Sequence, residues 1–191
     1  MAVRAVFLVG FMASGKSCVG RQLAERLDWD FVDLDTRIEA CEGRTVPEIF
    51  RERGESGFRQ AETKALLELT SNLDRETVVA LGGGTFVHPG NRNLLKPWPS
   101  VFLDAPADEL WRRALDDATE RPLRADATEF ARLHQSRLPS YREATVTIVT
   151  TGKDPISLCA EIERSLQFQA RGKATDSAEP RPASFRTGES Q

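Results

Sequence analysis

Cysteine and long apolar runs are scarce in this 191-residue sequence. The three cysteines are Cys18, Cys41 and Cys159. Their odd number, wide spacing and lack of a CxxC pair argue against a disulfide framework or a zinc site. The apolar run at residues 5–9 is too short for a membrane span or for the core of a signal peptide. We therefore expect a cytoplasmic protein with reduced thiols and no membrane partner.

Excess charge of one sign is also lacking. The formal net charge at pH 7 is −3, from 26 lysines and arginines against 29 aspartates and glutamates. A nucleic-acid-binding domain carries a basic surface, so we expect no nucleic-acid partner, and a local basic cluster would instead suit a small anionic ligand. The length and the hydrophobic content of 40% fit one compact domain with a sizeable core. We expect this domain to be monomeric.

The chain does contain a regular alternation of short apolar runs and helical patterns. Runs that favour strands stand at residues 6–9, 31–33, 77–80, 101–104 and 145–149. Apolar residues at helical spacing indicate helices at residues 16–27, 45–52, 57–73, 89–96, 107–114 and 155–168. In the last of these helices we expect an inward face of Ile156, Cys159, Ile162 and Leu166. The alternation predicts an α/β fold with three layers, α/β/α, around a five-stranded parallel sheet. Ligands of such sheets bind beyond the carboxyl ends of the strands.

The composition changes near residue 171. Polar and small residues dominate from there to residue 191, and Phe185 is the only large apolar side chain. Such a segment buries too little surface to offset its ordering entropy. We expect one domain over residues 1–170 and a disordered tail over residues 171–191.

The segment GFMASGKS at residues 10–17 matches the P-loop pattern GxxxxGK[ST]. It follows a predicted strand and opens a predicted helix, and this context favours a phosphate site over an ordinary glycine-rich turn. Backbone N–H groups and the helix N-terminus would surround the phosphates of a nucleoside triphosphate. Lys16 would reach its β- and γ-phosphates, and the Ser17 hydroxyl would bind Mg²⁺. The nucleotide-binding residues expected here are Gly10, Ala13, Ser14, Gly15, Lys16, Ser17 and Cys18. The motif does not indicate what receives the phosphate.

Two carboxylates follow the second predicted strand. Asp33 and Asp35 are two residues apart, and on a strand this spacing would turn both toward the same side. One would support the magnesium ion and the other would orient an acceptor hydroxyl. The alternative is that Asp35 only caps a helix.

Two arginines and a run of glycines complete the acceptor side. Arg59 ends the segment GESGFR, Gly82, Gly83 and Gly84 follow the third strand, and Arg137 begins the segment RLPSY. Three consecutive glycines would let a ligand approach the backbone closely. Arginines that reach one pocket would bind a carboxylate, because a guanidinium pairs with both of its oxygens.

The order GFMxSGKSxxG, DxD, GExGFR, GGG, RPL and RxxxY resembles the shikimate kinases over about residues 5–168. GESGFR followed by LGGG is the discriminating part, because many unrelated proteins share the P-loop. The sequence departs from the family pattern at Ala13, where glycine is common, at Cys18, where threonine is usual, and at Arg124, where leucine is common. Residues 121–137 also form a shorter stretch than usual.

The resemblance implies a P-loop kinase with a mobile lid near residues 115–128. Its reaction would move the γ-phosphate of ATP to the 3-hydroxyl of shikimate, giving shikimate 3-phosphate and ADP for aromatic amino-acid biosynthesis. It implies catalytic roles for Lys16, Asp35 and Arg121 and magnesium binding by Ser17 and Asp33. The implied shikimate-binding residues are Asp35, Arg59, Gly82, Gly83, Gly84 and Arg137, and the further nucleotide-binding residues are Arg113, Arg121, Asp154 and Pro155.

Two other functions stay open at this stage. A related small-molecule kinase, acting on gluconate or a nucleotide, would share the fold but is not expected to combine the arginines with the glycine run. A non-catalytic nucleotide-binding module would not need the full set of Lys16, Ser17, Asp33, Asp35 and Arg121.

Overall fold

The computed structural model describes residues 5–116 and 126–167. Five parallel strands form one sheet in the order β2-β3-β1-β4-β5. The strands are β1 Ala5–Val9, β2 Asp30–Asp33, β3 Thr77–Ala80, β4 Ser100–Asp104 and β5 Val146–Val149. Each lies within one residue of its predicted position, because buried parallel strands read as continuous apolar runs between turns.

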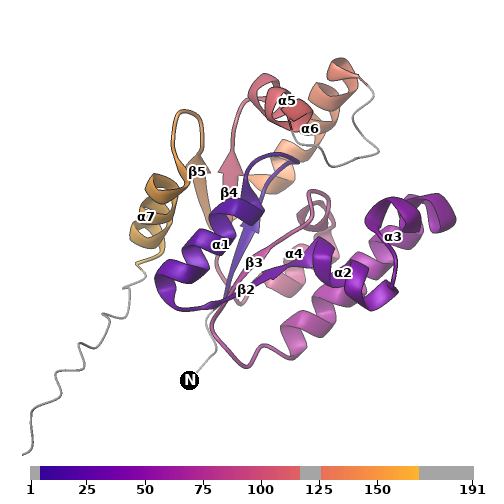
Figure 1. Cartoon of the computed structure of the whole chain (residues 1–191), viewed down its shortest axis with the longest axis horizontal. Coiled ribbons are helices and arrows are strands. Elements are labelled where there is room, and N and C mark those ends of the chain that lie inside the picture. Colours follow the sequence, from indigo (N-terminus) through magenta and orange to yellow (C-terminus); the bar gives the residue numbers. More distant parts are fainter. Residues whose placement is uncertain (1–4, 117–125, 168–191) are drawn as a thin grey trace, which may run out of the picture.

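Alternate residues of the central strand enter two separate cores. Val6 and Leu8 of β1 pack with α1 (Lys16–Leu27) and α7 (Pro155–Leu166). Phe7 and Val9 pack on the opposite face of the sheet with the remaining helices, as expected for side chains that alternate along a strand. Figure 1 shows α1 and α7 on one side of the sheet and α3 and α4 on the other. The predicted three-layer α/β/α fold is confirmed.

The helices of the second face differ from the prediction in two ways. The helices expected at residues 45–52 and 57–73 form one kinked helix, α3 (Val46–Ser71), in which Gly54 has non-helical angles (φ 67°, ψ −176°). Two further helices, α2 (Leu34–Glu42) and α6 (Ala127–Tyr141), were not predicted. The short turn η1 (Thr85–Val87), α4 (Pro89–Leu95) and α5 (Ala107–Asp116) complete the described elements.

The predicted inward face of α7 is wrong at one residue. Ile156 is 57% exposed, whereas Leu158, Cys159 and Ile162 are buried. Two residues correspond to about 200° around a helix of 3.6 residues per turn, so Ile156 and Leu158 cannot share a face. Among the helices that the structure describes, none is long and apolar enough to cross a membrane.

Candidate active site

The P-loop connects the middle strand of the sheet to α1. Residues 10–15 lie between Val9, the last residue of β1, and Lys16, the first residue of α1. The loop turns through positive φ angles at Gly10 (152°), Ala13 (60°) and Gly15 (89°). Ala13 therefore takes a left-handed conformation that glycine would adopt with less strain. The Lys16 ammonium lies inside the turn and donates to the carbonyl oxygens of Gly10 (3.0 Å) and Phe11 (2.9 Å).

A pair of oxygen donors lies beside this loop. The Ser17 hydroxyl donates to Asp33 Oδ2 at 2.5 Å, which joins the start of α1 to the end of β2. Asp33 Oδ1 accepts from the backbone N–H of Asp35 at 3.1 Å, so Asp33 caps α2. Two interpretations from the sequence need correction. The helix cap is Asp33 and not Asp35, and Asp35 stands in the first turn of α2 and not on a strand.

The carboxyl ends of three neighbouring strands bring the expected groups together. Asp33 of β2 lies opposite Ala80 of β3, and Ala80 lies opposite Leu8 of β1. The glycine segment, residues 82–84, thus leaves the sheet between the P-loop and α2. A Cβ on Gly82 would lie 2.6 Å from Asp35 Oδ1, so the structure brings Asp35 against this segment.

Both predicted arginines reach the glycine segment, from different helices. Arg59 of α3 lies so close to Gly84 that a Cβ there would overlap its guanidinium. Arg137 of α6 donates from Nη1 to the Gly83 carbonyl oxygen at 3.2 Å. The sequence suggested that the glycines leave room for a ligand, and the structure shows that the protein's own side chains also occupy that room. Arg137 is buried, and its Cζ lies 5.5 Å from the ring centroid of Phe11.

Sequence reasoning missed a buried carboxylate behind Arg59. Glu62 is fully buried, binds Arg59 at 2.8 Å and accepts from Thr85 Oγ1 at 2.5 Å. Burial alone would lower the pKa of Arg59, but the carboxylates of Glu62 and Glu55 outweigh burial and raise the Arg59 pKa. The only sequence signal was the spacing of three residues between Arg59 and Glu62, which places the two on one helix face without indicating burial.

The weaker nucleotide-site predictions lie together near the end of β5. Arg113 of α5 is paired with Glu109 and approaches Thr150 Oγ1 at 3.4 Å. Asp154 accepts from the N–H of Ser157 at 3.0 Å and so caps α7. This geometry brings Arg113 to the loop that precedes Asp154 and Pro155, and their contact with a nucleotide stays a prediction. Arg121 lies outside the described residues, as do Arg124, residues 117–125 of the expected lid and the tail.

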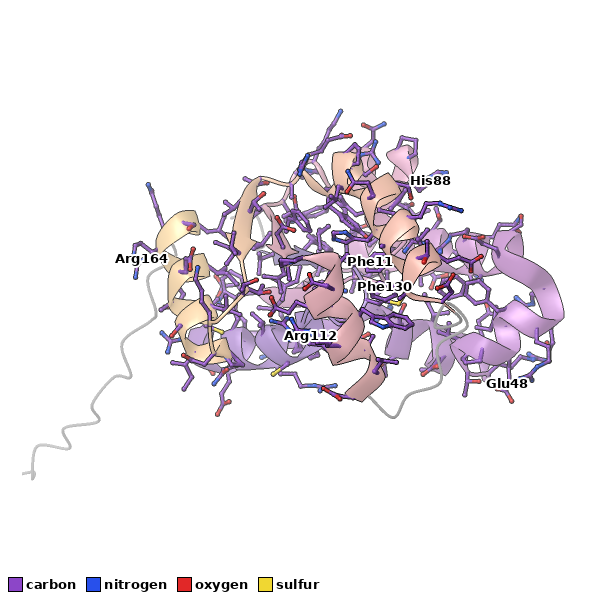
Figure 2. All side chains as sticks on the ribbon, turned by 90° about the horizontal axis from the view of Figure 1, so that it is seen from above. Phe11, Glu48, His88, Arg112, Phe130 and Arg164 are labelled. Carbon is purple, nitrogen blue, oxygen red and sulfur yellow. The ribbon has the colours of Figure 1, made fainter. Side chains whose placement is uncertain are left out.

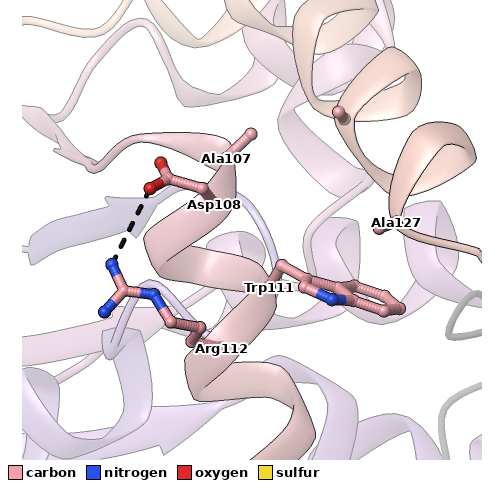
Figure 3. Close-up of a pocket in the computed structure, with 6 residues that line it drawn as sticks. Ala107, Asp108, Trp111, Arg112 and Ala127 are labelled. Carbon is pink, nitrogen blue, oxygen red and sulfur yellow. Dashed lines mark ion pairs between the residues drawn. The ribbon is translucent and has the colours of Figure 1, made fainter.

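A hollow of about 510 Å³ lies between α5 and α6, apart from the predicted site residues. It is lined by Ala107, Asp108, Trp111, Arg112, Ala127 and Ala131, and the ion pair between Asp108 and Arg112 stands at its side (Figure 3). Trp111 also packs against Phe130, with ring centroids 5.1 Å apart. Phe130 in turn packs edge to face against Phe11, a P-loop residue, with ring centroids 4.9 Å apart. Figure 2 shows these two rings side by side near the middle of the molecule.

The comparison with protein families decides the identity. A family model described as shikimate kinase matches residues 12–167. The chain belongs to the shikimate kinase family. A shikimate kinase of Synechococcus elongatus is 43% identical over 154 residues, which cover 78% of this chain and 80% of that protein. As a family member the chain is an ATP-dependent kinase, so the predicted family and enzyme class are confirmed.

Solved structures agree with this assignment. A shikimate kinase from Acinetobacter baumannii, solved in complex with shikimate, has a TM-score of 0.81 and 37% identity, and the match covers 87% of this chain and 94% of that one. A gluconokinase from Sinorhizobium meliloti has a TM-score of 0.56 and 18% identity over 87% of this chain and 93% of that one. The second likeness concerns the fold alone, so the gluconate kinase alternative is less well supported than the shikimate kinase family.

Proposed function

We propose that this shikimate kinase binds the carboxylate of shikimate between Arg59 and Arg137 while ATP phosphorylates the 3-hydroxyl. The observation that carries the proposal is that these arginines come from separate helices and reach neighbouring residues, Gly84 and Gly83. Each guanidinium has five N–H donors in a planar fork, more than the protein contacts described above use. Two such forks that reach adjacent glycines suit a single small carboxylate.

The P-loop side suits ATP and Mg²⁺. Backbone N–H groups of residues 10–15 and the first turn of α1 would hold the phosphates, with Lys16 near the transferred group. The oxygens of Ser17 and Asp33, which lie within 2.5 Å of each other, are the hard donors that Mg²⁺ prefers. Bound there, Mg²⁺ would neutralise phosphate charge. No group of three or more His, Cys, Asp or Glu side chains in the described residues is arranged to hold a metal, which fits an ion bound largely through phosphate and water.

Asp35 is the residue proposed to orient the acceptor hydroxyl and accept its proton. It lies at the start of α2, against Gly82 and next to the cap formed by Asp33. A base must lie within hydrogen-bond reach of the proton that it takes. The position of Asp35 against Gly82 supports an acceptor bound between this carboxylate and the P-loop. Arg121 is proposed to stabilise charge on the transferred phosphoryl group, as an arginine finger does.

We also propose that the enzyme acts in the cytoplasm as a monomer. Cys18, Cys41 and Cys159 are all free thiols, which suits a reducing compartment. Size-exclusion chromatography tests the monomer directly, since a dimer would double the apparent mass.

A coupled ADP-release assay tests the acceptor. It compares shikimate with an analogue that lacks the carboxylate and with gluconate. We expect the analogue to show a kcat/KM at least about tenfold below that of shikimate, because one hydrogen bond to a charged group contributes ~1.5–3 kcal/mol. Equal turnover of the analogue would contradict the proposed carboxylate site, and phosphorylation of gluconate instead of shikimate would assign the related kinase activity.

A further inference from the structure

The RxxxY pattern pairs Arg137 with a buried tyrosine. Tyr141, the single tyrosine of the chain, ends α6 four residues after Arg137. Residues four apart lie on one face of a helix, so the two side chains point the same way. Tyr141 is 1% exposed, and its ring packs on Phe102 of β4 with centroids 5.2 Å apart.

The hydroxyl of Tyr141 binds the atom that also holds Arg137. The Gly83 carbonyl oxygen accepts one hydrogen bond from the Tyr141 hydroxyl and another from Arg137 Nη1. A carbonyl oxygen has two lone pairs, so these two donors satisfy it and fix its direction. The Arg137 guanidinium is thereby held by a hydrogen bond from Nη1 to Gly83 and by stacking on the Phe11 ring. These two contacts leave other N–H groups of the guanidinium for a ligand.

The charge state of the phenol supports this arrangement. Burial raises the pKa of Tyr141 to about 12, although the nearby Arg137 opposes the shift. The hydroxyl therefore keeps its proton near neutral pH and remains a donor to Gly83.

We propose that Tyr141 is a positioning residue for acceptor binding, which orients Arg137 through the Gly83 carbonyl. This inference rests on the proposed function, since Arg137 must be a ligand of the shikimate carboxylate. Without the hydroxyl, the Gly83 carbonyl oxygen accepts only the hydrogen bond from Arg137. Its direction is then less fixed, and so is the orientation of the Arg137 guanidinium. The consequence falls on the acceptor and not on the nucleotide, because neither of the two hydrogen bonds touches the P-loop backbone.

The test is Tyr141→Phe, which removes one oxygen and keeps the ring on Phe102. We expect KM for shikimate to rise about three- to tenfold, the range for one lost hydrogen bond. KM for ATP and kcat should stay within about twofold of wild type, as expected when only ground-state binding of one substrate is weakened. In an Arg137→Lys background the same change should have little further effect on KM for shikimate, since residues that share a partner couple.

Phe102→Leu is the matched control for lost packing. It trims the ring that supports Tyr141 and should lower Tm while leaving KM for shikimate near the wild-type value. The positioning role is overturned if Tyr141→Phe lowers Tm as the control does but leaves KM for shikimate unchanged. An effect of full size in the Arg137→Lys background also overturns it. Wild-type turnover of shikimate is measured in the same series, and its absence would overturn the proposed function together with this inference.

Discussion

Glu62 is a buried charge that pairs with Arg59, one of the two arginines proposed to bind the acceptor. Its two carboxylate oxygens are divided between Arg59 Nη1 and the Thr85 hydroxyl, so it joins α3 to the turn that follows the glycine segment. Arg59 has a second partner in Glu55, at 3.3 Å, whose side chain is 69% exposed. The Arg59 guanidinium thus pairs with one buried and one solvated carboxylate. We expect the two carboxylates to contribute unequally to the unfolding free energy.

This inequality is testable with Glu62→Gln. The amide keeps the shape of the side chain but leaves Arg59 without its buried negative partner. We expect a loss of about 1–3 kcal/mol in unfolding free energy, the usual range when a buried polar partner is lost, and a higher KM for shikimate.

Glu55→Gln is the matched control, read out by chemical denaturation and steady-state kinetics. An exposed ion pair contributes only ~0–1 kcal/mol, so this variant should differ little from wild type. Similar losses in the two variants would show that burial of Glu62 has no special importance.

At the scale of an element, the kink at Gly54 divides α3 into two segments. Gly54 takes φ 67° and ψ −176° inside the helix, and a Cβ there would meet no atom within 4 Å. Only the backbone conformation requires glycine at this position. The kink separates the first turns of α3, where the Val46 N–H donates to Glu39 of α2, from the part that carries Arg59 and Glu62.

We therefore predict that Gly54→Ala lowers stability by ~1–3 kcal/mol, the cost of this backbone region for other residues, and raises KM for shikimate by moving Arg59. Gly43→Ala is the control. Gly43 ends α2 with φ 62°, again with open space around a Cβ, but it does not precede a site residue within its helix. If the two variants change KM for shikimate equally, the kink does not position Arg59.

The elements differ in how far their sequence predicts them. The P-loop was predictable because all of its groups lie within eight consecutive residues, from Gly10 to Ser17. α2 was missed because it begins directly after β2, without a loop, and buries only Leu34 and Ile38.

α6 and its site residues were harder to predict, for two reasons. Pro139 lies inside the helix and breaks the usual helical pattern. The roles of Glu62 and Tyr141 depend on contacts across 23 residues to Thr85 and 58 residues to Gly83. No local pattern contains such contacts, although the RxxxY spacing already placed Arg137 and Tyr141 on one helix face.

At the scale of the whole molecule, the strand order arranges the chemistry. β2, β3 and β1 are neighbours, and their carboxyl ends lead to Asp33, the glycine segment and the P-loop. The proposed acceptor site thus lies between Asp35 of α2 and the P-loop. Helices from the second face supply the arginines, Arg59 from α3 and Arg137 from α6. The central claim is that these two side chains bind one carboxylate.

The most direct measurement is a double-mutant cycle of KM for shikimate with Arg59→Lys and Arg137→Lys. Lysine keeps the charge but loses the planar fork. We predict that each single change raises KM for shikimate roughly tenfold, or about 1.4 kcal/mol, and leaves KM for ATP unchanged. The double variant should fall short of the sum by at least about 0.5 kcal/mol, because the two arginines share a partner. Fully additive effects, or a main defect in ATP binding for either variant, would contradict the shared carboxylate.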